Sequence, residues 1–215
     1  MTLVALSASY GAGGSVIGPA LADRLGVPFL DRAIPIAVAS QLDVPLDQAE
    51  AYEQASESFL DRLLRGFVGT DVGVPAPVPA EAFTSEDFRR ATEDVLLRQA
   101  RTGEGVILGR AAVVVLRDHP GVLRVRLEGP RERRVRQAMV LGGVDEDAAN
   151  AALERVDRTH GEYARQFYGA DIRDPSLYHL VLDSTAIALD ACVELIALSA
   201  ESLGPRAANS PDRRT

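Results

Sequence analysis

The chain has 215 residues, 47% hydrophobic and 25% charged, which is the composition of one globular domain. Its single cysteine, Cys192, excludes an internal disulfide and a metal site built from several cysteines, and no apolar run is long enough to span a membrane. The net charge of −8 argues against general nucleic-acid binding. The N-terminal stretch lacks the pattern of a secretory signal, so we expect a cytoplasmic protein that binds neither membranes nor nucleic acids.

Every one of the 23 basic residues is an arginine, because the sequence contains no lysine. This absence removes each chemistry that needs a lysine amine: Schiff bases, lysine general bases and the lysine of a nucleotide-binding phosphate loop. A phosphate site in this chain must therefore use backbone amides, arginine or a bound cation.

Short apolar runs alternate with stretches of helical periodicity along the chain, and no hairpin signal separates them. In chain order, we expect strands over residues 3–7, 27–30, 106–108, 122–127 and 178–182. The expected helices cover residues 16–25, 34–42, 46–67, 84–102, 130–142, 145–168 and 186–203, with a proline-rich loop over 66–82. This alternation predicts an α/β fold with a parallel sheet of about five strands and helices on both faces, whose ligands bind at the carboxyl ends of the strands.

A glycine-rich turn separates the first expected strand from the first expected helix, with Ser15 as the candidate N-cap. Glycines at such a turn let backbone amides face a phosphate at the positive end of the helix. The dinucleotide fingerprint fails here, because Val16 or Ser15 stands where its last glycine is needed. The phosphate-loop pattern matches at Gly13 and Ser15 but has Ala8 for its first glycine and Gly14 for its lysine. A tight turn without a ligand stays an alternative.

Several motifs together resemble the cytidylate kinase-like family, a branch of the nucleoside monophosphate kinases within the phosphate-loop NTPases. The resemblance covers about residues 3–200. Its motifs are Ser7-x-x-Tyr10-Gly11-x-Gly13-Gly14, Ile17-Gly18, Pro28-Phe29-Leu30-Asp31, Gly109-Arg110, Arg134, the group Arg155, Asp157 and Arg158, and the run Leu180–Thr185.

This resemblance implies ATP- and Mg²⁺-dependent phosphoryl transfer to a nucleoside monophosphate, with CMP or dCMP as the acceptor. It implies one domain over residues 1–203, with a helical monophosphate-binding insert at about 45–83, a lid at about 143–175 and a disordered tail at 204–215. By the same resemblance, Arg155 and Arg158 are catalytic, and the ATP phosphates bind at Tyr10, Gly11, Ala12, Gly13, Gly14 and Ser15. Ser15 is also the magnesium ligand, and the acceptor binds at Asp31, Arg110, Arg134 and Asp183.

Three departures from the family pattern leave other functions open. Cytidylate kinases carry an aspartate where this chain has Ala111, further lid arginines where it has His160 and Glu162, and the loop lysine. The alternatives are a nucleotide-binding protein with little or no phosphoryl transfer and a regulatory role, or a kinase for another small acceptor.

Several of these candidate site residues also fit roles that involve no ligand. Asp31 and Asp183 suit helix caps, Arg110 suits an ion pair, and the lid arginines suit a solvated helix face.

Overall fold

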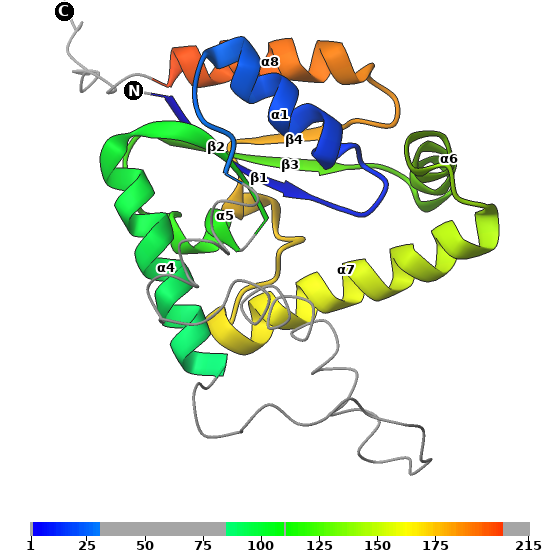
Figure 1. Ribbon diagram of the computed structural model, residues 1–215, viewed down its shortest axis with the longest axis horizontal. Coiled ribbons are helices and arrows are strands. Elements are labelled where there is room, and N and C mark those ends of the chain that lie inside the picture. Colours follow the sequence, from blue (N-terminus) through cyan, green and yellow to red (C-terminus); the bar gives the residue numbers. More distant parts are fainter. Residues whose placement is uncertain (1, 31–84, 110, 204–215) are drawn as a thin grey trace, which may run out of the picture.

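The computed structural model describes residues 2–30, 85–109 and 111–203 (Figure 1). Its four strands form one parallel sheet in the order β2-β1-β3-β4. The strands are β1 (Thr2–Ala8), β2 (Glu104–Leu108), β3 (Val122–Glu128) and β4 (Leu180–Asp183). The helices are α1 (Gly14–Leu25), α4 (Ser85–Thr102), α5 (Ala112–Val115), α6 (Arg131–Gly142), α7 (Glu146–Tyr168) and α8 (Leu189–Ser202), with a 3₁₀ turn at Pro175–Leu177. The α/β architecture with a parallel sheet is thus confirmed.

The strand expected over residues 27–30 is reduced to a single bridge beside β2. Phe29 pairs with Val106 in the parallel direction, and Leu30 N donates to Val106 O at 2.8 Å. Pro28 has no N–H to donate, and it only accepts from Val106 N at 2.9 Å. The described part of the sheet therefore has four strands, with this bridge at its outer edge. The expected helices at 34–42 and 46–67, the loop at 66–82 and the tail at 204–215 lie outside the described residues.

Helices cover both faces of the sheet, as the alternation of strands and helices predicts. In β1, Val4 and Leu6 pack into a core shared with α1 and α8, whereas Leu3 and Ala5 pack into a second core with α4 and α5. Figure 1 shows α1 and α8 on one side and α4, α5 and α7 on the other. Because β1 is buried on both faces, its sequence over residues 3–6 is a continuous hydrophobic run without alternating polar residues.

Two helix starts differ from the sequence prediction. Helix α1 begins at Gly14 with Gly13 as its N-cap, so Ser15 lies inside the first turn and is not the cap. Gly13 has a φ of 74°, a left-handed conformation that favours glycine. Helix α8 begins at Leu189 and not near residue 186, so Asp183 does not cap it.

Helices α6 and α7 end where the sequence predicts. Left-handed glycines follow both, Gly143 after α6 and Gly169 after α7, and Asp145 caps α7 by accepting from Ala148 N at 2.8 Å. A small third core joins the two helices, and the side chain of Tyr10 packs against it. No helix among the described residues is long and apolar enough to cross a membrane.

Candidate phosphate loop and adjoining cavity

The glycine-rich loop between β1 and α1 packs directly against the start of α6. Gly11 and Gly13 both have a φ of 74°, and a Cβ placed on Gly11 would lie 2.2 Å from the carbonyl oxygen of Arg134. No larger residue fits at Gly11 without moving the α6 backbone. Glycine is therefore required at position 11 for two reasons: the positive φ of the backbone and the close approach of the Arg134 carbonyl.

Part of the loop backbone is already hydrogen-bonded and part is not. Tyr10 N donates to Asp157 Oδ1 at 2.9 Å, and Ala12 N donates to Ser9 O at 3.0 Å. Within the described residues, the amides of Gly13, Gly14 and Ser15 have no acceptor. These three amides form the N-terminal end of α1, whose first turn contains no acidic residue. They are available to an anion, and the helix dipole favours one there.

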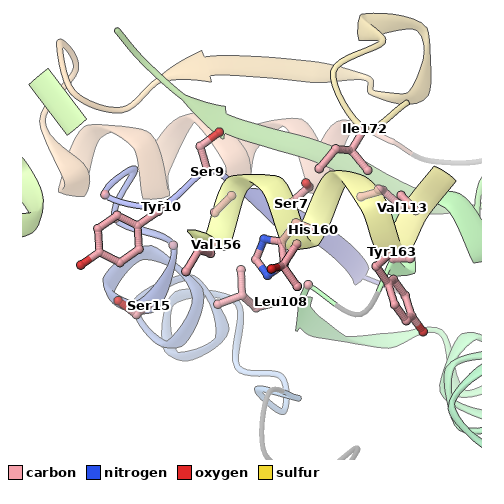
Figure 2. Close-up of a pocket in the computed structure, with 18 of the residues that line it drawn as sticks. Ser7, Ser9, Tyr10, Ser15, Leu108, Val113, Val156, His160, Tyr163 and Ile172 are labelled. Carbon is pink, nitrogen blue, oxygen red and sulfur yellow. The ribbon is translucent and has the colours of Figure 1, made fainter. Parts of the chain in front are cut away.

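The loop opens onto a cavity of about 470 Å³ beneath α7 (Figure 2). Side chains of the β1 end, the loop, α6 and α7 form its walls, and none of the described lining residues is acidic. From α7, Val156, His160 and Tyr163 face it. The other polar lining side chains are Ser7, Ser9, Tyr10, Ser15, Thr92 and Thr159. A cavity whose described lining has polar groups and no carboxylate suits an anionic ligand.

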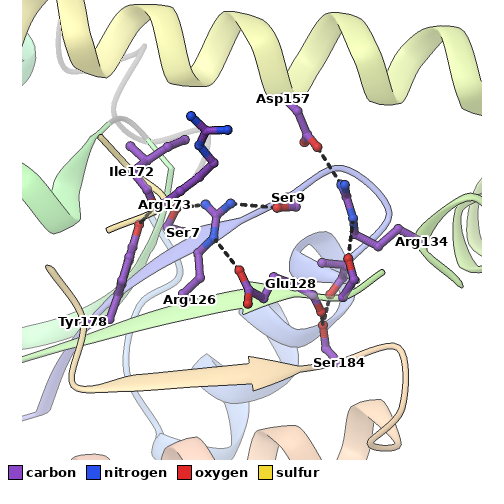
Figure 3. Close-up of polar contacts among 12 residues, drawn as sticks. Ser7, Ser9, Arg126, Glu128, Arg134, Asp157, Ile172, Arg173, Tyr178 and Ser184 are labelled. Atoms are coloured by element: carbon purple, nitrogen blue, oxygen red, sulfur yellow. Dashed lines mark hydrogen bonds and ion pairs between the residues drawn. The ribbon is translucent and has the colours of Figure 1, made fainter. Parts of the chain in front are cut away.

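Side chains of α6 and α7 hold the loop in place (Figure 3). Arg134 Nη1 donates to Tyr10 O at 2.9 Å and to Asp157 Oδ2 at 2.7 Å, and Arg134 Nε donates to Gly129 O at 2.9 Å. Gln137 Nε2 donates to Gly11 O at 3.0 Å. We call Tyr10, Arg134 and Asp157 the loop clamp. It joins three segments that are far apart in the sequence.

The predicted site residues fall into several groups. Tyr10, Gly11, Gly13, Gly14 and Ser15 line the cavity. Ala12 is fully buried in the core, and its carbonyl accepts from Ser184 Oγ at 2.7 Å, so it does not line the cavity.

The predicted arginines and acidic residues do not gather at the cavity as the loop residues do. Arg134 lies beside the loop, but its guanidinium is occupied by the clamp. Arg155 and Arg158 are exposed on α7 and are not part of the cavity wall. Asp31 and Arg110 lie outside the described residues.

Asp183 closes a local turn at the end of β4. Its Oδ1 accepts from Thr185 Oγ1 at 2.6 Å, and its Oδ2 pairs with Arg133 Nη2 at 3.0 Å. The Thr185 hydroxyl, and after it the Thr185 amide and Arg133, lower the pKa of the Asp183 carboxyl. These contacts satisfy the carboxylate locally, and Asp183 does not line the cavity.

Sequence reasoning missed three polar residues at the carboxyl end of the sheet. Ser7 and Ser9 line the cavity, and Arg126 of β3 donates to both of their hydroxyls. The available signal was a pair of arginines, Arg124 and Arg126, on one side of a strand whose other residues are apolar up to Leu127. The sequence alone did not show that β3 pairs with β1 at Ser7.

Residues 3–186 match the family model of the cytidylate kinase-like family. Among curated proteins, the chain is 23% identical over 196 residues to a cytidylate kinase of Pyrobaculum aerophilum, covering 91% of this chain and 90% of that one. It is 28% identical over 152 residues to a uronate isomerase of Corynebacterium glutamicum, covering 70% of this chain but only 29% of the isomerase.

Among solved structures, an uncharacterised protein from Eubacterium ventriosum shares the fold at a TM-score of 0.64 and 16% identity, covering 94% of this chain and 99% of that one. The family match extends from β1, through the glycine-rich loop and the cavity, to the end of β4. The chain therefore belongs to the cytidylate kinase-like family.

Proposed function

We propose that this protein transfers a phosphoryl group from ATP to a small anionic acceptor, and that the acceptor is CMP or dCMP. The observation that carries the proposal is the glycine-rich loop. Its amides at residues 13–15 have no acceptor among the described residues, and the described lining residues of the cavity onto which they open include no carboxylate. Family membership and the likeness to a cytidylate kinase over nine-tenths of both chains support the same reaction.

In this mechanism the loop supplies the phosphate site of ATP. The amides of Gly13, Gly14 and Ser15 bind phosphate oxygens at the positive end of α1. Ser15 is exposed in the first turn of α1 and lines the cavity, so its hydroxyl suits a ligand of the Mg²⁺ that accompanies ATP. The cation would neutralise charge on the phosphates. Phosphoryl transfer otherwise needs alignment and positive charge, which this lysine-free chain must take from arginine.

Arg155 and Arg158 are our proposed source of that charge, with Asp31, Arg110, Arg134 and Asp183 proposed to bind the acceptor. The two α7 arginines are exposed, whereas Val156, His160 and Tyr163 of the same helix face the cavity. Arg158 would therefore reach the transferred group only after α7 rotates or shifts over the loop. Arg134 would contact the acceptor only if the loop clamp rearranged.

Two alternatives keep the same site. The protein could bind a nucleotide for regulation without transferring phosphate, or it could phosphorylate another small anion. The exposed lid arginines favour the first alternative, because no arginine of the described residues lines the cavity as it stands.

A coupled assay that follows ADP release from MgATP separates these functions. Each nucleoside monophosphate is offered in turn, with ATP affinity measured on the same sample by calorimetry. Turnover with CMP or dCMP above all other monophosphates supports the proposal. Tight ATP binding without turnover on any acceptor would replace it with the regulatory function.

A further inference from the structure

Arg126 is a buried arginine at the carboxyl end of β3 that the proposed mechanism does not use. Only 6% of the residue is exposed. Nη1 donates to Ser7 Oγ at 2.8 Å, and Nη2 donates to Ser9 Oγ at 2.7 Å. Figure 3 shows the guanidinium pointing at both serines. The parallel register places Ser7 directly opposite Arg126, so the first contact follows from the sheet itself.

The direction of these hydrogen bonds determines what the serines offer to the cavity. A guanidinium has only donors, so each serine oxygen must accept from Arg126 and each hydroxyl proton must point elsewhere. Within the described residues, neither hydroxyl donates to another group, and both serines line the cavity. Arg126 therefore turns Ser7 and Ser9 into two polarised O–H donors at the cavity wall.

The described residues balance the charge of Arg126 only weakly. Within the described part of the chain, the carboxylate that pairs with it is that of Glu128, whose Oε2 lies 3.8 Å from Nε and whose side chain is 49% exposed. Nε itself makes no hydrogen bond. Because a buried charge is costly without a close counter-charge, a negative group bound in the cavity would stabilise this guanidinium through the two serines.

We infer that Ser7 and Ser9, held by Arg126, bind an anionic oxygen of the acceptor. The inference rests on the proposed function, because Ser9 directly precedes Tyr10 and the phosphate loop, which places the anion next to the ATP phosphates. Arg126 is a positioning residue in this role, since it acts through the serines. The shared chemistry of the ligand is an oxyanion, which a phosphate or a carboxylate supplies.

The decisive variant is Arg126→Met, because it removes the charge and the two hydrogen bonds to the serines at similar side-chain volume. Arg124→Met is the matched control: Arg124 lies on the same side of β3, but it donates to the carbonyls of Leu177 and Arg117 and does not line the cavity. Ser9→Ala is the second variant and leaves Arg126 in place. Thermal unfolding checks that each variant is folded.

Calorimetry then measures the affinity of each variant for CMP, for cytidine, for gluconate and for MgATP. We expect Arg126→Met and Ser9→Ala to lose about 10-fold or more in affinity for the anionic probe that wild type binds, the effect of one hydrogen bond to a charged group. Cytidine and MgATP affinities should change less than about 3-fold, and Arg124→Met should match wild type. A preference of wild type for CMP identifies a phosphate, and a preference for gluconate identifies a carboxylate.

Two results would overturn the inference: folded Arg126→Met and Ser9→Ala that bind the anionic probe as tightly as wild type, or wild type that binds neither CMP nor gluconate more tightly than cytidine. The proposed function fails separately. If the anion binds through these residues but MgATP never yields a phosphorylated product, the anion site stands and the kinase does not.

Discussion

Removing the carboxylate of Asp157 tests the loop clamp and should destabilise the protein by about 2–3 kcal/mol. Asp157 accepts from the Tyr10 amide at 2.9 Å and from Arg134 Nη1 at 2.7 Å, and the Arg134 side chain is only 11% exposed. Hydrogen bonds to charged groups contribute about 1.5–3 kcal/mol each. Two such bonds sum to at least about 3 kcal/mol. We expect a cost at or just below that limit, because the Asp157 side chain is 29% exposed and water can replace part of what is lost.

The matched control is Glu154→Ala. Glu154 also joins α7 to α6, through Arg131 Nη2 at 2.7 Å, but its side chain is 67% exposed and that of Arg131 is 43% exposed. An exposed pair of this kind is worth about 0–1 kcal/mol. Urea unfolding of wild type, Asp157→Ala and Glu154→Ala measures the difference. In a domain of this size, the Asp157 variant should also melt about 4–12 °C lower.

A double-mutant cycle with Arg134→Met isolates the charge-assisted bond. The two substitutions should couple by about 1 kcal/mol or more, because each removes the other's partner. The reasoning is refuted if Asp157→Ala costs no more than Glu154→Ala, or if the cycle shows no coupling. In either case the clamp would contribute no more than an ordinary surface ion pair.

Three further changes test other parts of the molecule. Gly11→Ala should cost at least about 1 kcal/mol more than Gly169→Ala by urea unfolding and should abolish ATP binding, because both glycines have positive φ but only Gly11 has a backbone oxygen where the Cβ would lie; equal costs would contradict this. Arg158→Ala should lower kcat by about 10²-fold or more with little change in ATP affinity, because it is proposed to act on charge that develops during transfer; unchanged turnover would exclude the arginine lid. His179→Gln should reduce the loss of folding stability that wild type shows as the pH drops below about 6.5. Burial, and after it Arg124, lower the pKa of His179 in the folded protein. The unfolded chain therefore takes up the proton at a higher pH than the folded chain, and protonation favours unfolding. Identical pH profiles would argue against it.

Local signals in the sequence were sufficient for most of the fold. Pro130 and the glycines at 142 and 143 mark the two ends of α6, and Asp145 marks the start of α7, each within one or two residues of the observed end. These residues act on neighbouring backbone groups, so their effect can be predicted without knowledge of the tertiary structure.

The sequence analysis did not predict the short helix α5, because its local signals favour a strand. Its sequence, Ala-Val-Val-Val, is rich in β-branched residues that favour strands. The helix forms because Ala111 takes a φ of 52° before it and its apolar side chains are buried in the second core. Tertiary burial overrides local preference there.

For the candidate site, the sequence predicts the part that one segment carries, and it does not predict contacts between segments. The loop followed from the order of strand, glycines and helix. The clamp pairs Arg134 with Asp157, 23 residues away, and the loop with α7 at a separation of 147 residues. The Arg126 contacts likewise depend on the pairing of β3 with β1. No spacing rule predicts such contacts in a single sequence.

The helix that covers the cavity is also the helix whose carboxylate holds the Tyr10 amide. Any rotation of α7 that brings its arginines toward the phosphates must therefore stretch or break that bond. If the loop binds phosphate as proposed, phosphate affinity and the position of α7 are thermodynamically linked. The linkage is reciprocal: a ligand that favours one position of α7 binds more tightly, by the same factor, when that position is already stabilised. A substitution of Asp157 would change this balance at a residue that is not proposed to contact a ligand.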